Sequence, residues 1–116
     1  MYYICGMRTM IRTADFDEFY NSLSANVQNK VKYAMSILAE VKVINTKLVK
    51  RLVDTDFYEL RISVGNEYRV ILFTIDHENF IEAEQILLLN GFMKKSTKDY
   101  KKEIKKAEQI LKNLQQ

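Results

Sequence analysis

One stretch of sequence, residues 57–73, limits what this chain can fold into more than any other. Two runs rich in apolar and aromatic residues, FYELRISV and EYRVILF, flank Gly65 and Asn66. Such runs on either side of a tight glycine-containing turn predict a β-hairpin. Each predicted strand carries an arginine, Arg61 or Arg69, whose guanidinium cannot give up its proton and is costly to bury alone. The hairpin therefore needs either acidic partners inside the fold or an anionic ligand outside it.

The length of the turn decides whether the two arginines share a face. A clean two-residue turn would leave Arg61 and Arg69 on opposite faces of the hairpin, because side chains alternate along a strand. A three-residue loop, or a β-bulge, shifts this parity and brings both to one face. A shared anion site therefore predicts an odd loop or a bulge within residues 64–68.

Hydrophobic periodicity predicts the elements before the hairpin. A strand is expected at residues 7–12. Asp15 and Glu18 are expected to cap a first helix, and Ser24 a second one that packs beside it. Residues 42–55 fit either a short helix or an irregular crossing.

The elements after the turn are expected to be more deeply buried. Residues 68–75 and 81–90 are nearly continuous in apolar side chains, as expected of strands covered on both faces. Gly91 is expected to end or bend the second of them. Ser96, with Asp99, is expected to cap a C-terminal amphipathic helix.

These elements predict an α+β fold with a small, mainly antiparallel sheet, in the order β-α-α-β-β-β-α. The chain is long enough for one domain, residues 1–116, with residues 1–6 as a candidate N-terminal extension. A single cysteine, Cys5, cannot form an internal disulfide, which favours a cytoplasmic location. No apolar run approaches the ~20 residues that span a bilayer, so no membrane association is expected.

Positive charge is concentrated in two places. Residues 94–116 hold eight lysines against three acidic residues, whereas residues 1–93 hold ten basic and twelve acidic side chains. No acidic residue occurs in residues 41–53, which contain a second basic patch made of Lys42, Lys47, Lys50 and Arg51. Such clusters indicate a nucleic-acid binder or a binder of an acidic protein.

Several kinds of catalytic site are not expected. The only histidine, His77, lies in a polar loop without a cysteine pair, so neither a metal site nor a cofactor is predicted. No glycine-rich phosphate loop and no serine in a nucleophile-elbow context is present. What remains is a basic and aromatic set: Tyr58, Arg61, Tyr68, Arg69, Lys94, Lys95, Lys98 and Tyr100.

This set can support RNA cleavage without histidine or metal. The RNA supplies its own nucleophile, the 2′-hydroxyl, and fixed cations can stabilise the charge that develops on the phosphate. The structural alternative is that Arg61 and Arg69 are paired with Glu59, Glu67 or other carboxylates beside a solvated basic helix. Residue types alone leave both open.

Four segments of the sequence resemble one known family. They read YELR at residues 58–61, EYRV at 67–70, LLNGFMKKSTK at 88–98 and EI-x-x-A at 103–107. The pattern is similar to the HigB-like, phage-derived branch of the RelE/ParE toxin superfamily. The resemblance implies a RelE-like fold and a toxin of a type II toxin–antitoxin pair. Most such toxins cleave mRNA in the ribosomal A site and are held inactive by an antitoxin, and a minority poison DNA gyrase.

The resemblance also implies roles for particular residues. Arg61 and Arg69 match the arginines that the family places on the scissile phosphate, and Lys94 or Lys95 matches a basic residue after the last strand. Tyr100 resembles a tyrosine used in proton transfer or base stacking. The family's catalytic histidines are missing, so lysine, or charge stabilisation alone, would have to serve. The residues expected to bind RNA are Lys47, Lys50, Arg51, Tyr68, Lys98, Lys101 and Lys102.

Three functions follow from these features. The first is a metal-independent mRNA endoribonuclease, expected to act on the ribosome and to be neutralised by a helix-turn-helix antitoxin. The second is a gyrase-inhibiting toxin of the same fold. The third is a non-catalytic basic module that binds nucleic acid or an acidic protein.

Overall fold

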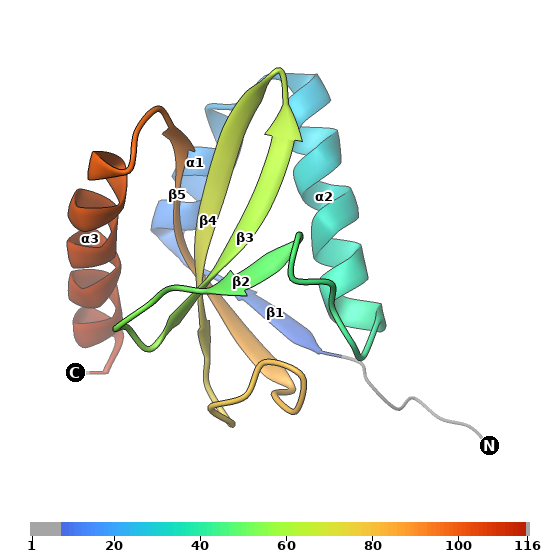
Figure 1. Cartoon of the computed structure of the whole chain (residues 1–116), viewed down its shortest axis with the longest axis vertical. Helices are drawn as coiled ribbons and strands as arrows, with labels where there is room; N and C mark the ends of the chain where they lie inside the picture. The colour runs from blue at the N-terminus through green and yellow to red at the C-terminus, as the bar shows by residue number, and fades with distance from the viewer. Residues whose placement is uncertain (1–7, 116) are drawn as a thin grey trace.

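The computed structural model describes residues 8–115, which form a five-stranded sheet with helices on both of its faces (Figure 1). The strands follow the order β1-β5-β4-β3-β2, and all neighbours are antiparallel except the parallel pair β1–β5. The predicted α+β class and mainly antiparallel sheet are confirmed. The elements are β1 (Thr9–Arg12), α1 (Ala14–Asn21), α2 (Ala25–Glu40), β2 (Val49–Arg51), β3 (Phe57–Val64), β4 (Asn66–Thr74), β5 (Gln85–Lys94) and α3 (Lys98–Leu114).

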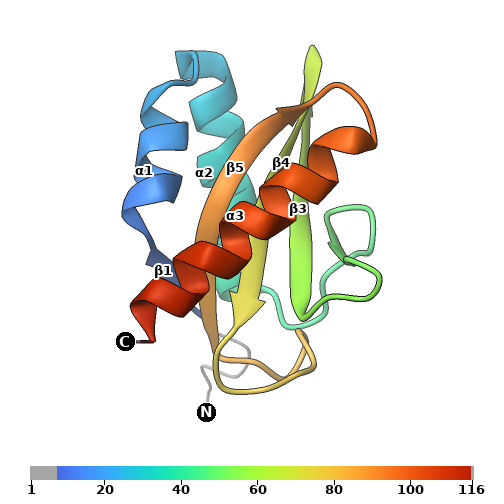
Figure 2. The same ribbon diagram turned by 90° about the vertical axis from the view of Figure 1, so that its left-hand side faces the viewer.

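Helices cover the two faces of the sheet unequally. The pair α1 and α2 packs on one face, and α3 alone crosses the other face diagonally (Figure 2). The central strands β4 and β5 contribute to both cores: Val70 and Leu72 belong to the core beneath α1 and α2, whereas Ile71 belongs to the core beneath α3. The expectation of strands buried on both faces is therefore confirmed for β4 and β5.

The hairpin has an odd connection, as a shared arginine face requires. Val64 pairs with Asn66, so Gly65 alone lies between β3 and β4. Its φ of +71° is in the left-handed region, which glycine adopts without the steric cost that a Cβ would add. In the resulting register Arg61 lies directly opposite Arg69. The predicted parity is confirmed, although Asn66 is the first residue of β4 and not part of the turn.

The last strand differs from the prediction. β5 starts four residues later than the predicted strand, because Asp76 accepts the backbone N–H groups of Glu84 and Gln85 and holds the preceding residues in a loop. It then continues through Gly91, and a register shift against β4 bends it there. A Cβ at Gly91 would lie 2.3 Å from Cδ2 of Phe19, so glycine makes room for α1 at this point.

Two expectations in the first half of the chain differ from the structure. Thr13, not Asp15 with Glu18, caps α1: its hydroxyl accepts the Phe16 N–H at 3.0 Å and donates to a carbonyl of β5. Residues 42–55 contain no helix: most of them form the irregular crossing that was the other alternative, but they also include the short edge strand β2, which was not predicted and which pairs with the otherwise open edge of β3. Three strand residues are too few for a periodic signal.

The predicted caps of α2 and α3, Ser24 and Ser96, are confirmed in part. Ser24 caps α2 through its side chain, as expected. At α3 the Asp99 carboxylate accepts the N–H groups of Lys95 and Ser96, but Thr97 occupies the cap position. The predicted strand began at Met7, which lies outside the described residues. No helix within residues 8–115 is long and apolar enough to cross a membrane.

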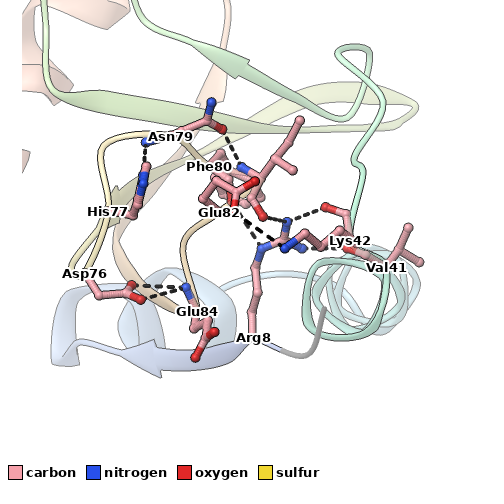
Figure 3. A network of polar contacts seen from close by, with 10 residues as sticks. Arg8, Val41, Lys42, Asp76, His77, Asn79, Phe80, Glu82 and Glu84 are labelled. Carbon is pink, nitrogen blue, oxygen red and sulfur yellow. Dashed lines mark hydrogen bonds and ion pairs between the residues drawn. The ribbon is translucent and has the colours of Figure 1, made fainter. Parts of the chain in front are cut away.

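The buried Arg8 connects the C-terminal end of α2 to the loop before β5. The Arg8 guanidinium donates to the carbonyl oxygens of Leu38, Val41, Lys42, Phe80 and Ile81, as Figure 3 shows in part. It thereby satisfies carbonyls at the C-terminal end of α2, which a helix leaves unpaired. The same group ties that end to the loop before β5, and its burial lowers the Arg8 pKa.

Candidate functional site

The two arginines of the hairpin lie on the face that α3 covers. Alternation along β3 and β4 turns Glu59, Arg61, Glu67 and Arg69 toward this face, and α3 adds Tyr100. We call these five residues the arginine cluster. Two like charges directly opposite each other on adjacent strands repel, so the pairing of Arg61 with Arg69 requires nearby anions.

Arg69 is the buried member of the cluster, with a side chain that is 2% exposed. Its Nε lies 2.9 Å from Oε1 of Glu59 and donates to the Tyr100 hydroxyl at 3.0 Å. Its Nη1 donates to Glu67 Oε1 at 3.1 Å and to the Tyr68 carbonyl at 2.9 Å. Burial lowers the pKa of Arg69, but the hydrogen bonds to Tyr100 and Glu67 outweigh it and raise the pKa overall. The structural alternative of carboxylate partners is thus observed for Arg69.

Arg61 is placed differently from Arg69. Its side chain is 36% exposed, and none of residues 8–115 accepts a hydrogen bond from its buried Nε. The nearest anion is Oε1 of Glu59, at 4.0 Å, which is too far for a hydrogen bond. Arg61 therefore has a donor that the described part of the chain does not use.

Tyr100 contacts both the buried Arg69 and the lysine at the end of β5, Lys94. Its hydroxyl donates to Glu59 Oε1 at 2.6 Å, and its ring meets the edge of Phe92. Burial and the hydrogen bond to Glu59 raise the pKa of Tyr100, so the hydroxyl keeps its proton. Lys94, opposite Glu67 in the β-sheet register, holds its Nζ 5.5 Å from the centre of the Tyr100 ring. This distance permits a cation–π contact.

Glu67 is the exposed carboxylate of the arginine cluster. Its carboxylate accepts the Ser63 hydroxyl at 2.6 Å on one oxygen and Arg69 Nη1 on the other. The hydrogen bond from Ser63, the larger effect, and the one from Arg69 both lower the pKa of Glu67. Glu67 is therefore an anion at neutral pH, held at the exposed end of the arginine cluster.

The structure brings together only some of the predicted site residues. Arg61, Arg69, Lys94 and Tyr100 lie within one cluster and its border. Lys50 joins them on the same face, because it pairs with Glu59 in the register of β2 and β3. The exposed side chains of Lys95, Lys98, Lys101 and Lys102 follow the β5–α3 turn and the first turns of α3.

Three predicted RNA-binding residues lie elsewhere. Tyr68 points to the opposite face, where it packs beside the core under α1 and α2. Arg51 lies over the Tyr58 ring, which packs against that same core, and Lys47 is exposed in the loop before β2. These positions place Tyr68 and Arg51 on the other side of the sheet from the arginine cluster.

Sequence reasoning named Glu59 and Glu67 only as structural partners and missed their central place. Alternation along β3 already puts Glu59 on the face of Arg61, and this was the available signal. Across residues 8–115, no three histidine, cysteine, aspartate or glutamate side chains form a group that could hold a metal ion.

The sequence matches the model of one protein family. The sequence model for "Phage derived protein Gp49-like" matches residues 18–112, which is most of the chain. The chain belongs to this phage-derived Gp49-like family. No sequence among curated proteins matches it significantly.

Solved structures agree with the fold of this Gp49-like chain. The free-state structure of an arginine-to-alanine mutant of the E. coli toxin RelE has a TM-score of 0.60 at 14% identity, and the match covers 85% of this chain and 96% of that one. The RelBE2 toxin–antitoxin complex of Mycobacterium tuberculosis gives a TM-score of 0.53 at 15% identity, over 76% of this chain and 99% of that one. At these identities the similarity establishes a RelE-like fold.

Proposed function

We propose that this protein is the toxin of a type II toxin–antitoxin pair. In this proposal it is a metal-independent endoribonuclease that cleaves mRNA on the ribosome, and a helix-turn-helix antitoxin neutralises it. Membership of the phage-derived Gp49-like family supports a toxin, as do the two matched structures, whose names describe a toxin and a toxin–antitoxin complex. The branch of HigB-like toxins is compatible with these findings.

One observation carries the proposal: Arg61 and Arg69 share a face, with Lys94 and Tyr100 beside them. A phosphate that approaches this face from solvent meets the partly exposed side chain of Arg61 and the ammonium group of Lys94. Arginine suits this task because its planar fork can bind two phosphoryl oxygens at once. Lys50, on the same face at the edge of the sheet, extends the positive surface along the RNA backbone.

The proposed reaction needs no group beyond these side chains, the RNA and water. The 2′-hydroxyl gives its proton to water and attacks the adjacent phosphorus. A bond forms between the 2′-oxygen and phosphorus, the bond between phosphorus and the 5′-oxygen breaks, and the 5′-oxygen leaves with a proton, which gives a 2′,3′-cyclic phosphate and a free 5′-hydroxyl. Arg61 and Lys94 stabilise the charge on the phosphoryl oxygens, an effect whose loss typically costs 10²- to 10³-fold in rate. Lys94 or Lys95 supplies the proton to the leaving oxygen. Tyr100 gives its hydrogen to Glu59, so its part is to hold Arg69 and to support Lys94.

Controlled expression in bacteria tests the proposal. We expect the wild-type chain to arrest growth with mRNA cut inside codons, as mapped by primer extension. Arg61→Ala, and Lys94→Ala combined with Lys95→Ala, should abolish the cuts. Lys105→Ala combined with Lys106→Ala removes the same charge from the exposed surface of α3 and should leave the cuts unchanged. Intact mRNA with DNA damage would instead support the gyrase-inhibiting alternative.

A non-catalytic basic module is the second candidate, and the burial of Arg69 between two carboxylates favours it. Such a module would bind nucleic acid or an acidic protein through Lys94–Lys98 and α3 without cutting RNA. Absence of growth arrest and of mRNA cuts at good expression would favour this candidate over both toxins.

A further inference from the structure

We infer that Glu59 is the positioning residue of this site, an inference that rests on the proposed function. Its side chain is 8% exposed and lies between the two opposed arginines. A buried carboxylate is costly to desolvate unless its oxygens are paired. Here one oxygen, Oε1, is shared among three groups of the candidate site: Tyr100, Arg69 and Arg61.

The three closest atoms form a triangle. Glu59 Oε1 lies 2.6 Å from the Tyr100 hydroxyl and 2.9 Å from Arg69 Nε, and these two lie 3.0 Å apart. Because the hydroxyl gives its only hydrogen to Glu59, its lone pairs are left to accept the Arg69 Nε–H. Glu59 therefore sets the direction of the Tyr100 hydroxyl and, through it, the plane of the Arg69 guanidinium.

Charge compensation alone would not require this arrangement. Glu67 also neutralises Arg69, but it contacts Nη1 at the exposed end and does not reach Tyr100. The two carboxylates thus provide a matched comparison. Each carboxylate offsets one positive charge beside Arg69. Only Glu59 of the two also contacts Tyr100 and so links β3 to α3.

The consequence of losing Glu59 is misorientation of the reacting groups. Small displacements of positioned groups can cost up to 10²-fold in rate, whereas affinity for a polyanion depends on total charge. Glu59→Gln removes a negative charge and keeps the shape of the side chain. We therefore expect kcat for mRNA cleavage to fall about tenfold while KM changes by less than about twofold. Because Glu59 acts through Tyr100, adding Tyr100→Phe should cause no further loss.

A nuclear magnetic resonance measurement tests the positioning without any activity. The side-chain Nε–Hε signal of Arg69, assigned with Arg69→Lys, should be shifted and slow to exchange in the wild-type chain and in Glu67→Gln. In Glu59→Gln and in Tyr100→Phe it should move toward the position of solvent-exposed arginines. Tyr100→Phe provides this test even where Glu59→Gln does not fold.

The outcomes separate the two hypotheses. If Glu59→Gln and Glu67→Gln change the Arg69 signal equally, or if neither changes it, the positioning role is overturned. If the wild-type chain cuts no RNA, the proposed nuclease fails, and the Arg69 signal alone then decides whether Glu59 orients Arg69 and Tyr100. If cleavage occurs and both glutamate variants alter kcat and KM alike, Glu59 contributes charge only.

Discussion

Arg61 and Arg69 face each other across two strands, yet their surroundings give them different tasks. Arg69 is buried and bonded to Glu59, Glu67 and Tyr100, whereas the side chain of Arg61 is partly exposed and none of residues 8–115 accepts a hydrogen bond from its buried Nε. Arg69→Ala should cost about 3 kcal/mol or more of the free energy of unfolding, because it leaves the Glu59 carboxylate buried without its main partner. Arg61→Ala should cost less than about 1 kcal/mol, as for other partly exposed groups.

Urea unfolding of both variants measures these differences. A similar midpoint for Arg61→Ala and Arg69→Ala would contradict the division of tasks. The comparison also guides the activity assay, since a loss of cleavage in Arg61→Ala then reports on phosphate binding and not on folding.

Tyr100 gives the second prediction at this scale. Burial and the hydrogen bond to Glu59 raise its pKa above the value of about 10 that it has in the unfolded chain. The protonated hydroxyl therefore stabilises the fold below that unfolded value, and this contribution is lost as the pH rises through the higher folded pKa. In an alkaline titration followed by tyrosinate absorbance, Tyr100 should ionise late, and Tyr100→Phe should remove that late step. Removal of an early step instead would show that Tyr100 is not held by Glu59.

Between elements, the contact of α1 with β5 depends on the absence of a side chain at Gly91. Gly91→Ala would place a Cβ 2.3 Å from the Phe19 ring and should destabilise the fold by about 1–3 kcal/mol, as other overpacked sites do. In a Phe19→Leu background the same substitution should cost less, because the smaller side chain leaves room. A double-mutant cycle of thermal unfolding tests this coupling, and additive effects would show that the two elements do not meet there.

Arg8 joins α2 to the loop before β5 and yields a second prediction about elements. Arg8→Lys keeps the charge but loses the planar fork that reaches five carbonyls and lies over Phe80. Hydrogen exchange should therefore quicken in residues 80–84 and at the end of α2. Arg12→Lys changes only an exposed ion pair with Asp17 and serves as the control. Equal protection in both variants would assign Arg8 no role in holding these segments.

Elements with strong local patterns were predictable, and those set by tertiary contacts were not. The Ser24 cap of α2, the bonds of Asp99 to the backbone before α3, and the buried strands β4 and β5 follow from local residue types. The edge strand β2 exists because β3 offers it a partner, which three residues of sequence cannot signal. Thr13 caps α1 because β5 lies close enough to share its hydroxyl.

The candidate site shows the same limit. The sequence left the parity of the turn open, and only the hypothesis of a shared anion site predicted that Arg61 and Arg69 share a face, which the register confirms. The pairing of Arg69 with Glu59 and Glu67 was an alternative that strand alternation allowed, but the hydrogen bonds of Tyr100 to Arg69 and Glu59 depend on the position of α3, which no local pattern fixes. Tyr68 illustrates the converse: next to Arg69 in sequence, it lies on the opposite face because strand side chains alternate.

Over the whole molecule, charge is divided between the arginine cluster and α3. The cluster has two carboxylates among its cations, whereas residues 94–116 carry eight lysines against three acidic residues. Long-range attraction of RNA should therefore come mostly from the lysines that lie after β5. Cleavage should instead depend on the few groups that meet the phosphate.

Salt dependence of RNA binding separates these two contributions. Lys101→Ala combined with Lys102→Ala should weaken binding at low salt and flatten the plot of log affinity against log salt by about 0.7 for each phosphate that the protein no longer neutralises. Cleavage at saturating RNA should stay as in the wild type, because neither lysine belongs to the cluster. Arg61→Ala should show the opposite balance, with a large loss of cleavage and a small change in slope. If the lysine pair leaves the slope unchanged, the basic surface of α3 faces something other than RNA, and an acidic segment of a protein partner becomes the occupant to test.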